Sequence, residues 1–434
     1  MILDRIFYDI SLHKKFLLYF FIMFYSSVFA QAININQKEQ TCILKHSDVY
    51  LDLNELNLSQ IRTQHLFKPY KKDYINTGML DTHIWVRFQL SNNTDQDIHK
   101  ILILTSPLLE NITLYRKSHL NKPQHKGVCH IKEEHHTLVP YYHIDLPAHT
   151  SETYYLKVYS LLTPVDFTLK LDDHEHFEYN DRVQQLIDIL LIGFVLALML
   201  YSFLLYFYTK DKSYLYYSFY LFALVYQQFT YLGLTQIYFP LSFIHFDMQI
   251  PVFKVNLLVI TATLFAMHFL KTKPLVKVHK IYQFFIAISL FEILFLSSSH
   301  FYNLYIVIFT GALFIFFNLS AGIISYKKGN KQARLFIVGF SIVCLSYFLI
   351  ILDAIGVTSI IQEYQNILMI GTAFEALILS LAFADRYLIL QKEKTRVDAR
   401  ISEESTQRTN IIESEVIKKT EALNSALETK ELLF

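Results

Sequence analysis

Seven long apolar stretches lie between residues 186 and 389 of this 434-residue chain and limit what it can fold into. Each is close to the roughly 20 residues that an α-helix needs to cross the hydrocarbon core of a bilayer. Hydrophobic residues make up 53% of the chain and charged residues 18%, which is typical of a polytopic membrane protein. The sequence therefore predicts a seven-helix transmembrane bundle over residues 182–390. The stretches lie at about 186–208, 214–235, 251–270, 281–298, 303–325, 333–352 and 366–389.

The charges in the loops between these stretches predict the orientation of the bundle. Ten basic residues fall in the loops after the first, third and fifth stretches, and none falls in the other three loops. Cytoplasmic loops carry an excess of Lys and Arg, so we expect the N-terminal part outside and the C-terminus inside. The ten are Lys210, Lys212, Lys271, Lys273, Lys277, Lys280, Lys327, Lys328, Lys331 and Arg334.

Residues 1–30 have the features of a secretory signal peptide. Arg5, Lys14 and Lys15 precede an apolar core at 16–24, and Ala30 follows at a small-residue cleavage site. An uncleaved membrane anchor is the alternative. Both place the next segment outside the cytoplasm.

Residues 31–181 are predicted to form a soluble outer domain. Residues 83–90 alternate strictly between apolar and mostly polar side chains, which is the pattern of a half-buried strand. Further short strands are expected at 101–104, 112–115, 154–158 and 167–171, separated by turn-forming residues. Several strands without intervening helices predict an all-β, jelly-roll-like sandwich with a ligand at its loops or concave faces. The Asp172–His176 run is expected to be a polar linker before the first span.

Residues 391–434 continue the last apolar stretch without a helix terminator, because no Gly or Pro follows Gly371. This charged segment is predicted to be a cytoplasmic helix. Its sparse apolar residues include steps of four and seven, with a shift of register near Ile411 and Ile412. This spacing favours a parallel coiled-coil homodimer, and a solvated single helix is the alternative. The residues so spaced are Val397, Ile401, Ile411, Val416, Leu423 and Leu427.

Ionisable residues inside the spans are costly to bury and therefore informative. Glu375 falls mid-span in the seventh stretch, and Glu292 falls within the fourth. Small residues at four-residue spacing, from Thr372 to Ala384, would let another helix approach close to Glu375, so a hydroxyl or carbonyl partner is expected. A purely structural pairing and a switching role both remain open for this carboxyl. Lys254 is expected to reach water along its aliphatic stem.

Other chemistry is weakly indicated. The run from His125 to His136 contains imidazole, thiol and carboxylate groups, but its spacing matches no zinc pattern, and a solvated hairpin is the favoured interpretation. Cys42 and Cys129 allow either one disulfide or two lone thiols. No cofactor or metal site is predicted. No basic cluster interleaved with aromatic residues points to a nucleic acid.

The chain resembles the bacterial seven-transmembrane receptors with diverse intracellular signalling modules. Residues 83–92 and 109–115 are similar to strands of the type-2 extracellular domain of that family. Residues 193–201, 211–217 and above all 371–386 are similar to its membrane region, and the last motif contains Glu375, Ser380, Asp385 and Arg386. These four are the candidate signalling residues.

The resemblance implies a sensor in the bacterial cytoplasmic membrane with a periplasmic domain that binds a small molecule or carbohydrate. Members normally pass the signal to a histidine kinase, a diguanylate cyclase or another output module, so a two-component partner is expected. No His follows His300 and no two glycines are adjacent, so no kinase or cyclase site is expected within the chain. The alternative is a sensor histidine kinase whose catalytic domains are missing from this chain. A transporter is disfavoured because paired, broken spans are lacking.

Overall fold

The computed structural model describes residues 41–431 except 64–65, 79–80, 132–135, 162, 298–300, 355–356 and 359–365. The predicted signal peptide lies outside the described residues. The chain divides into two compact units, which are treated separately below. The first contains the residues up to Leu186 together with Tyr231–His245 and Leu352–Glu363. The second contains Ile187–Thr230, Phe246–Ile351 and Tyr364–Phe434.

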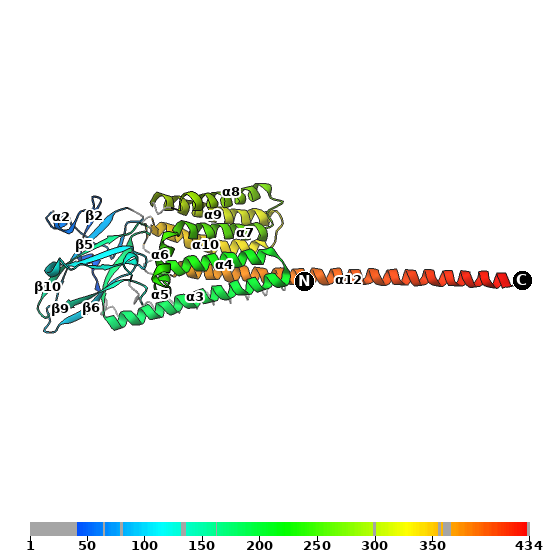
Figure 1. The fold of residues 1–434 in the computed structure, drawn as a ribbon, viewed down its shortest axis with the longest axis horizontal. Coiled ribbons are helices and arrows are strands. Elements are labelled where there is room, and N and C mark those ends of the chain that lie inside the picture. The colour runs from blue at the N-terminus through cyan, green and yellow to red at the C-terminus, as the bar shows by residue number, and fades with distance from the viewer. Residues whose placement is uncertain are drawn as a thin grey trace. The chain divides into compact units, whose positions relative to one another are not determined.

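Two antiparallel sheets form the outer domain in the first unit (Figure 1). The six-stranded sheet has the order β3 (Lys68–Pro69), β2 (Asp48–Asp52), β5 (His83–Ser91), β10 (Ser151–Tyr159), β7 (Asn111–Arg116) and β8 (Gln124–Lys126). The five-stranded sheet has the order β1 (Thr41–Cys42), β11 (Asp166–Asp172), β6 (Ile98–Leu104) and β9 (Tyr141–Leu146), with β4 (Tyr74–Asn76) also paired to β11. All five strands expected from the sequence are present.

The strand pairing is that of a jelly roll. Strands β7 and β8 pair, as do β6 and β9, β5 and β10, and β4 and β11. These nested pairs alternate between the two sheets, which is the result of winding one long antiparallel hairpin into a sandwich. The predicted jelly-roll-like sandwich is therefore confirmed.

Strand alternation explains both faces of the six-stranded sheet. Ile84, Val86 and Phe88 of β5 point into the core between the sheets, where they pack with residues of β6, β9, β10 and β11. Trp85 points to the opposite, outer face, where it is 1% exposed. It packs there with Ile61 of the short helix α2 (Leu58–Thr63) and with Tyr155. The outer face thus carries a small apolar cluster of its own.

No linker separates the outer domain from the first long helix. Strand β11 ends at Asp172 and helix α3 (His174–Thr209) begins two residues later. The Asp172 carboxylate accepts a hydrogen bond from the Asp173 backbone at 2.8 Å and lies 3.0 Å from the His176 ring. The expectation of a polar linker at 172–176 was wrong, because these polar side chains close the turn at the start of the helix.

The other long helices follow in chain order. They are α4 (Lys212–Tyr231), α7 (Pro251–Phe269), α8 (Val276–Phe295), α9 (Phe301–Lys327), α10 (Ala333–Ala354) and α12 (Ile367–Glu431), with the short helices α5 (Thr235–Tyr238) and α6 (Leu241–Gln249) between α4 and α7. Among the described residues, six helices are long and apolar enough to cross a membrane. Helix α4 occupies the second predicted span but is not among them, so the count of seven stays a prediction.

Helix α12 is a single helix of 65 residues, as the sequence predicted (Figure 1, orange to red). In its apolar part, Ile367–Ala384, 72% of the residues are buried inside the protein, compared with 17% for the corresponding window of α3. Residues 395–425 of the same helix are exposed. Helix α12 therefore has one half that is buried inside the protein and one half that has no neighbour among the described residues.

Candidate functional site

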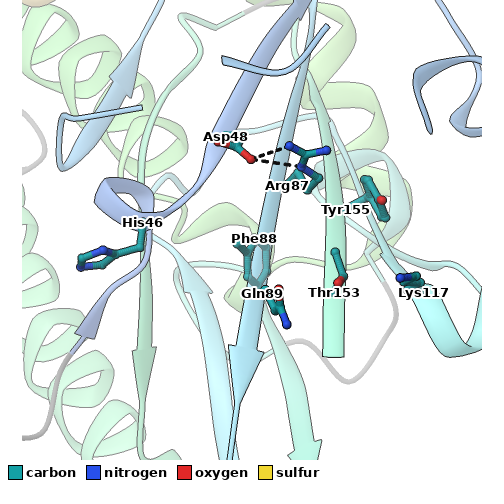
Figure 2. Close-up of a pocket in the computed structure, with 8 residues that line it drawn as sticks. All are labelled: His46, Asp48, Arg87, Phe88, Gln89, Lys117, Thr153 and Tyr155. Carbon is teal, nitrogen blue, oxygen red and sulfur yellow. Dashed lines mark hydrogen bonds and ion pairs between the residues drawn. The ribbon is translucent and has the colours of Figure 1, made fainter. Parts of the chain in front are cut away.

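A pocket of about 430 Å³ lies on the outer face of the six-stranded sheet (Figure 2). Strands β2, β5 and β10 supply its floor, and the turn after β7 contributes Lys117. Its volume is within the range of small-molecule sites. Most of its lining residues are polar, and they are His46, Asp48, Arg87, Phe88, Gln89, Lys117, Thr153 and Tyr155.

Strand register brings the central residues of this pocket together. Arg87 is paired with Asp48 on β2 and with Tyr155 on β10, so the three form a row across the sheet. The Arg87 guanidinium donates from Nη2 and Nε to one Asp48 oxygen at 2.6 and 3.1 Å. It also lies 4.6 Å from the centre of the Phe67 ring. The guanidinium is therefore fixed on two sides before any ligand arrives.

Aromatic rings extend the row beside the pocket. Trp85 lies two residues from Arg87 on the same face, donates from Nε1 to Asp52 at 3.2 Å, and stacks on Tyr115 at 5.9 Å. Tyr155, 7% exposed, lies 6.2 Å from Phe67. Fixed aromatic rings next to charged and hydroxyl-bearing side chains are the usual lining of a small-ligand site.

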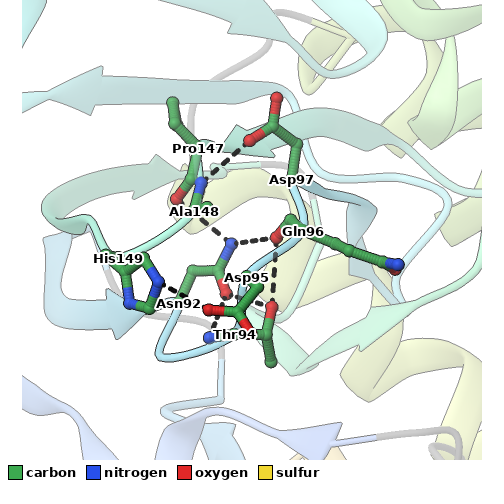
Figure 3. A network of polar contacts seen from close by, with 8 residues as sticks. All are labelled: Asn92, Thr94, Asp95, Gln96, Asp97, Pro147, Ala148 and His149. Carbon is green, nitrogen blue, oxygen red and sulfur yellow. Dashed lines mark hydrogen bonds and ion pairs between the residues drawn. The ribbon is translucent and has the colours of Figure 1, made fainter.

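The loops at 92–97 and 147–150 form a separate polar network (Figure 3). The Asn92 side-chain amide donates to the carbonyls of Gln96 at 2.8 Å and Pro147 at 3.1 Å. The Ala148 backbone donates to Asp97 at 2.8 Å, and His149 lies 2.9 Å from Asp95. These polar groups satisfy one another, so the network holds two loops together. The sheet face is the better candidate for ligand binding.

In the second unit, Glu375 is fully buried in the apolar half of α12. The Tyr220 hydroxyl of α4 lies 2.9 and 2.7 Å from its two carboxyl oxygens, to which it donates. A Cβ atom at Gly339 of α10 would lie 3.4 Å from the Glu375 Cγ, so glycine allows α10 to approach closely at this point. The hydroxyl partner that the sequence predicted is thus supplied by α4.

Three tyrosines of α4 donate hydrogen bonds to α12. Tyr214 donates to the carbonyl of Phe383 at 3.1 Å, and Tyr217 donates to the carbonyl of Ala376 at 2.8 Å. With Tyr220, they recur every third residue and so lie along one face of α4. All three are buried, at 4% exposure or less. Helix α4 therefore holds α12 by a row of hydroxyl groups, which the sequence analysis did not identify.

The other predicted signalling residues fall on the same helix. Ser380 is buried beside Tyr217. Asp385 and Arg386 are helical, but their side chains lie outside what the structure describes. The predicted small face is also present, because Thr372 and Ala376 are buried. The signalling role of all four candidates stays a prediction.

Lys254 does not reach water, and that expectation was wrong. Its side chain is 5% exposed, and its ammonium lies 2.9 Å from the carboxylate of Asp247, which is 1% exposed. Tyr226 and Thr230 of α4 donate to the same carboxylate at 2.7 and 2.9 Å. The sequence analysis had assigned Asp247 to a loop, whereas it lies in helix α6. A buried polar group made of four side chains thus joins three helices.

The histidine-rich segment shows no metal site among the described residues. His125 and His130 have ring centres 5.3 Å apart, and each ring bonds to a neighbouring side chain on β7. Lys132–His135 lie outside the described residues. Cys42 and Cys129 are free thiols, and burial raises the pKa of both.

Two family models match this chain. The model described as 7TMR-DISM extracellular 2 matches residues 45–173, which is the sandwich. The model described as 7TM diverse intracellular signalling matches residues 184–386, from α3 into α12. Together the two matches cover most of the chain. The chain belongs to the seven-transmembrane receptors with diverse intracellular signalling modules (7TMR-DISM).

Membership of the 7TMR-DISM family makes the chain a transmembrane sensory receptor with an extracellular domain and a signalling role. The extracellular match contains the outer pocket, and the membrane match contains Glu375 and the three tyrosines. A comparison with curated proteins finds no match.

Proposed function

We propose that this receptor binds a small molecule of the carbohydrate class in the outer pocket. It then passes a conformational signal through α12 to a cytoplasmic output module. The observation that carries the proposal is the division of α12 into a buried half and an exposed half within one unbroken helix. A rigid helix transmits a rotation or shift made at one end to the other.

The outer pocket supports the ligand part of this proposal. A sugar presents hydroxyl groups at its rim and C–H groups on its faces. The pocket offers the side chains of Arg87, Gln89 and Thr153 for the former and the ring of Tyr155 for the latter. The lone tryptophan of the chain, Trp85, lies on the same sheet face, so its fluorescence reports on this region alone.

The outer domain is connected at two points to chain segments that lead into long helices. Strand β11 continues into α3 after one intervening residue. The Asn76 side chain of β4 donates to the carbonyl of Thr358, in the segment between α10 and α12, at 3.3 Å. We propose that ligand binding shifts β4 and β11 and so shifts the population between two packings of the bundle.

The remaining parts of the proposal concern the inside of the cell. The exposed half of α12 forms a parallel homodimer through Val397, Ile401, Ile411, Val416 and Leu423, all of which are exposed in this chain. The receptor lies in the bacterial cytoplasmic membrane with α12 ending in the cytoplasm, as the loop charges favour. The output activity belongs to a two-component partner, either separate or joined after α12 as in a sensor histidine kinase.

Calorimetric titration of the full chain in nanodiscs with D-glucose and D-galactose tests the ligand part. The variant Tyr155→Ala is expected to weaken binding about tenfold or more, since it removes a buried ring from the pocket floor. The control Tyr179→Ala changes an exposed tyrosine of α3 and is expected to bind as the parent chain does. Equal affinities of Tyr155→Ala and the parent chain for these sugars would contradict a carbohydrate site in this pocket.

A further inference from the structure

The residues that line the outer pocket include two permanent cations, Arg87 and Lys117, and one carboxylate, Asp48. Asp48 is the one carboxylate among the residues lining the described pocket, and its Oδ2 is already engaged by Arg87. Lys117 lines the same pocket and has no carboxylate within ion-pair distance among the described residues. Lys157 adds a third cation to this face of the sheet, with its ammonium 5.3 Å from the centre of the Trp85 ring.

Arg87 retains donor capacity toward the pocket. Its Nε and Nη2 groups bond to Asp48, which leaves the Nη1 donors without a hydrogen bond to any described residue. Ion pairing with Asp48 and contact with Phe67 hold the guanidinium in one position. An arriving anion therefore meets an ordered donor and loses little affinity to the ordering of this side chain.

Two further carboxylates, Glu152 and Asp52, lie near the pocket lining and already accept hydrogen bonds from N–H groups. One oxygen of Glu152 accepts from the backbones of Ser118 and Thr153 at 3.1 and 3.2 Å. Asp52 is fully buried and accepts the Trp85 indole N–H. The nearby backbone of Asn54 donates to its other oxygen at 3.0 Å. Both Asp52 oxygens are therefore already engaged by N–H donors.

We infer that the ligand of the outer pocket carries a negative charge, and that Lys117 and Arg87 bind this charge while Tyr155 supports the rest of the molecule. This inference rests on the proposed function and specifies the ligand as an acidic sugar, such as a uronic acid. A carboxylate at the rim accepts from the Arg87 Nη1 group and from the Lys117 ammonium. Charged partners of this kind form the stronger class of hydrogen bonds in proteins.

The test compares two pairs of sugars, and the members of each pair differ only at C6, which is a carboxylate in one and a hydroxymethyl group in the other. The full chain in nanodiscs of zwitterionic lipid is titrated by calorimetry with D-glucuronate and with D-glucose, and then with D-galacturonate and D-galactose. At low salt each uronate is expected to bind about tenfold more tightly than its neutral counterpart. The difference is expected to shrink as salt is added, because both cations are partly exposed.

Two lysine variants test whether the preference for uronates comes from Lys117. Lys117→Gln keeps a polar side chain, one bond shorter, but removes its charge, so it is expected to abolish most of the preference for uronates. Lys122→Gln removes an exposed charge five residues away, outside the pocket, and is expected to leave the preference intact. Trp85 fluorescence confirms that both variants keep the packing of the outer face.

The other possible results contradict either the anionic ligand alone or the carbohydrate ligand as well. Equal affinity for uronates and neutral sugars, or an unchanged preference in Lys117→Gln, would overturn the anionic ligand but would leave a carbohydrate site that depends on Tyr155. No binding of any of the four sugars would overturn the carbohydrate proposal and this inference together.

Discussion

Glu375 and its partner Tyr220 show what a single residue contributes to this bundle. A carboxyl group at this depth must find a donor, and the sequence indicated that need from the position of Glu375 alone. It could not indicate which helix supplies the donor. Tyr220 is separated from Glu375 by 155 residues, and the helix packing that joins them leaves no periodic signal in the sequence.

The hydrogen bond from Tyr220 predicts a specific loss of stability. Tyr220→Phe leaves the buried carboxyl of Glu375 without that donor, which is expected to cost about 1–3 kcal/mol. Adding Glu375→Leu to Tyr220→Phe is expected to recover part of the loss. The measurement is thermal unfolding of the purified receptor in detergent. Tyr216→Phe on the same helix is the control, because its hydroxyl has no hydrogen-bond partner among the described residues. Equal effects of Tyr220→Phe and Tyr216→Phe would argue against the contact.

The buried ion pair of Lys254 and Asp247 predicts strong coupling between the two residues. Lys254→Met leaves Asp247 buried without its cation, and a loss of about 3–5 kcal/mol is expected. Replacing both, as Lys254→Met with Asp247→Leu, removes the uncompensated charge and is expected to be markedly less damaging. A double-mutant cycle on detergent-solubilised receptor measures this coupling. Additive losses in the two single variants and the double variant would contradict it.

A side chain at Gly127 is predicted to clash with the backbone, and Gly329 is a matched glycine that separates this clash from backbone strain. Gly127 and Gly329 have φ angles of +101° and +99°, so alanine is strained by a similar amount at both. A Cβ at Gly127 would lie 2.5 and 2.7 Å from the carbonyl oxygens of Glu110 and Leu109, whereas nothing lies within 4 Å at Gly329. Both variants carry the backbone strain, but Gly127→Ala adds the clash and is therefore expected to lower the melting temperature of the receptor more than Gly329→Ala does. Unchanged melting in Gly127→Ala would show that the loop adjusts without cost.

At the scale of elements, the alternation of apolar and polar residues was enough to predict many of the strands. The length of the apolar stretches was enough to predict many of the long helices. Strand β9 carries the same alternation as β5, and its residues Tyr142, Ile144 and Leu146 are buried. The sequence therefore contains the signal for this strand as well. Strand β2 offers no such signal, because Val49, Tyr50 and Leu51 follow one another between two acidic ends and do not alternate with polar residues.

The outer pocket could not be predicted from the sequence, because its residues come from separate strands. Asp48, Arg87 and Tyr155 meet only through the register of three strands that are far apart in the chain. The sequence could predict a ligand at loops or concave faces of the sandwich. It could not predict which face, because strand order and register are not encoded in the local pattern.

The loops between helices predict a labelling pattern. In a cysteine-free background made by replacing Cys42, Cys129 and Cys344, single cysteines at Phe239 and Val357 are expected to react with an impermeant maleimide added to spheroplasts. Cysteines at Lys273 and Gly329 are expected to react only after lysis. All four positions are exposed in the structure. Labelling of Gly329→Cys in intact spheroplasts would reverse the proposed orientation.

At the scale of the whole molecule, the central claim is that α12 carries the signal out of the bundle. Its apolar half is held by α4 through Tyr214, Tyr217 and Tyr220, and its charged half continues as the same helix. The sequence predicted this continuity, because no helix terminator follows Gly371.

Disulfide scanning of the exposed half of α12 in native membranes tests this claim most directly. Single cysteines from 395 to 425, in the cysteine-free background, are oxidised and scored for crosslinked dimer, with Glu375→Gln and Glu375→Leu compared against the parent chain. We expect crosslinking maxima near Val397, Ile401, Val416 and Leu423, and a shift of those maxima in Glu375→Leu. If Glu375→Leu inserts normally and leaves the crosslinking profile unchanged at every position, α12 does not pass the state of the bundle to its exposed half.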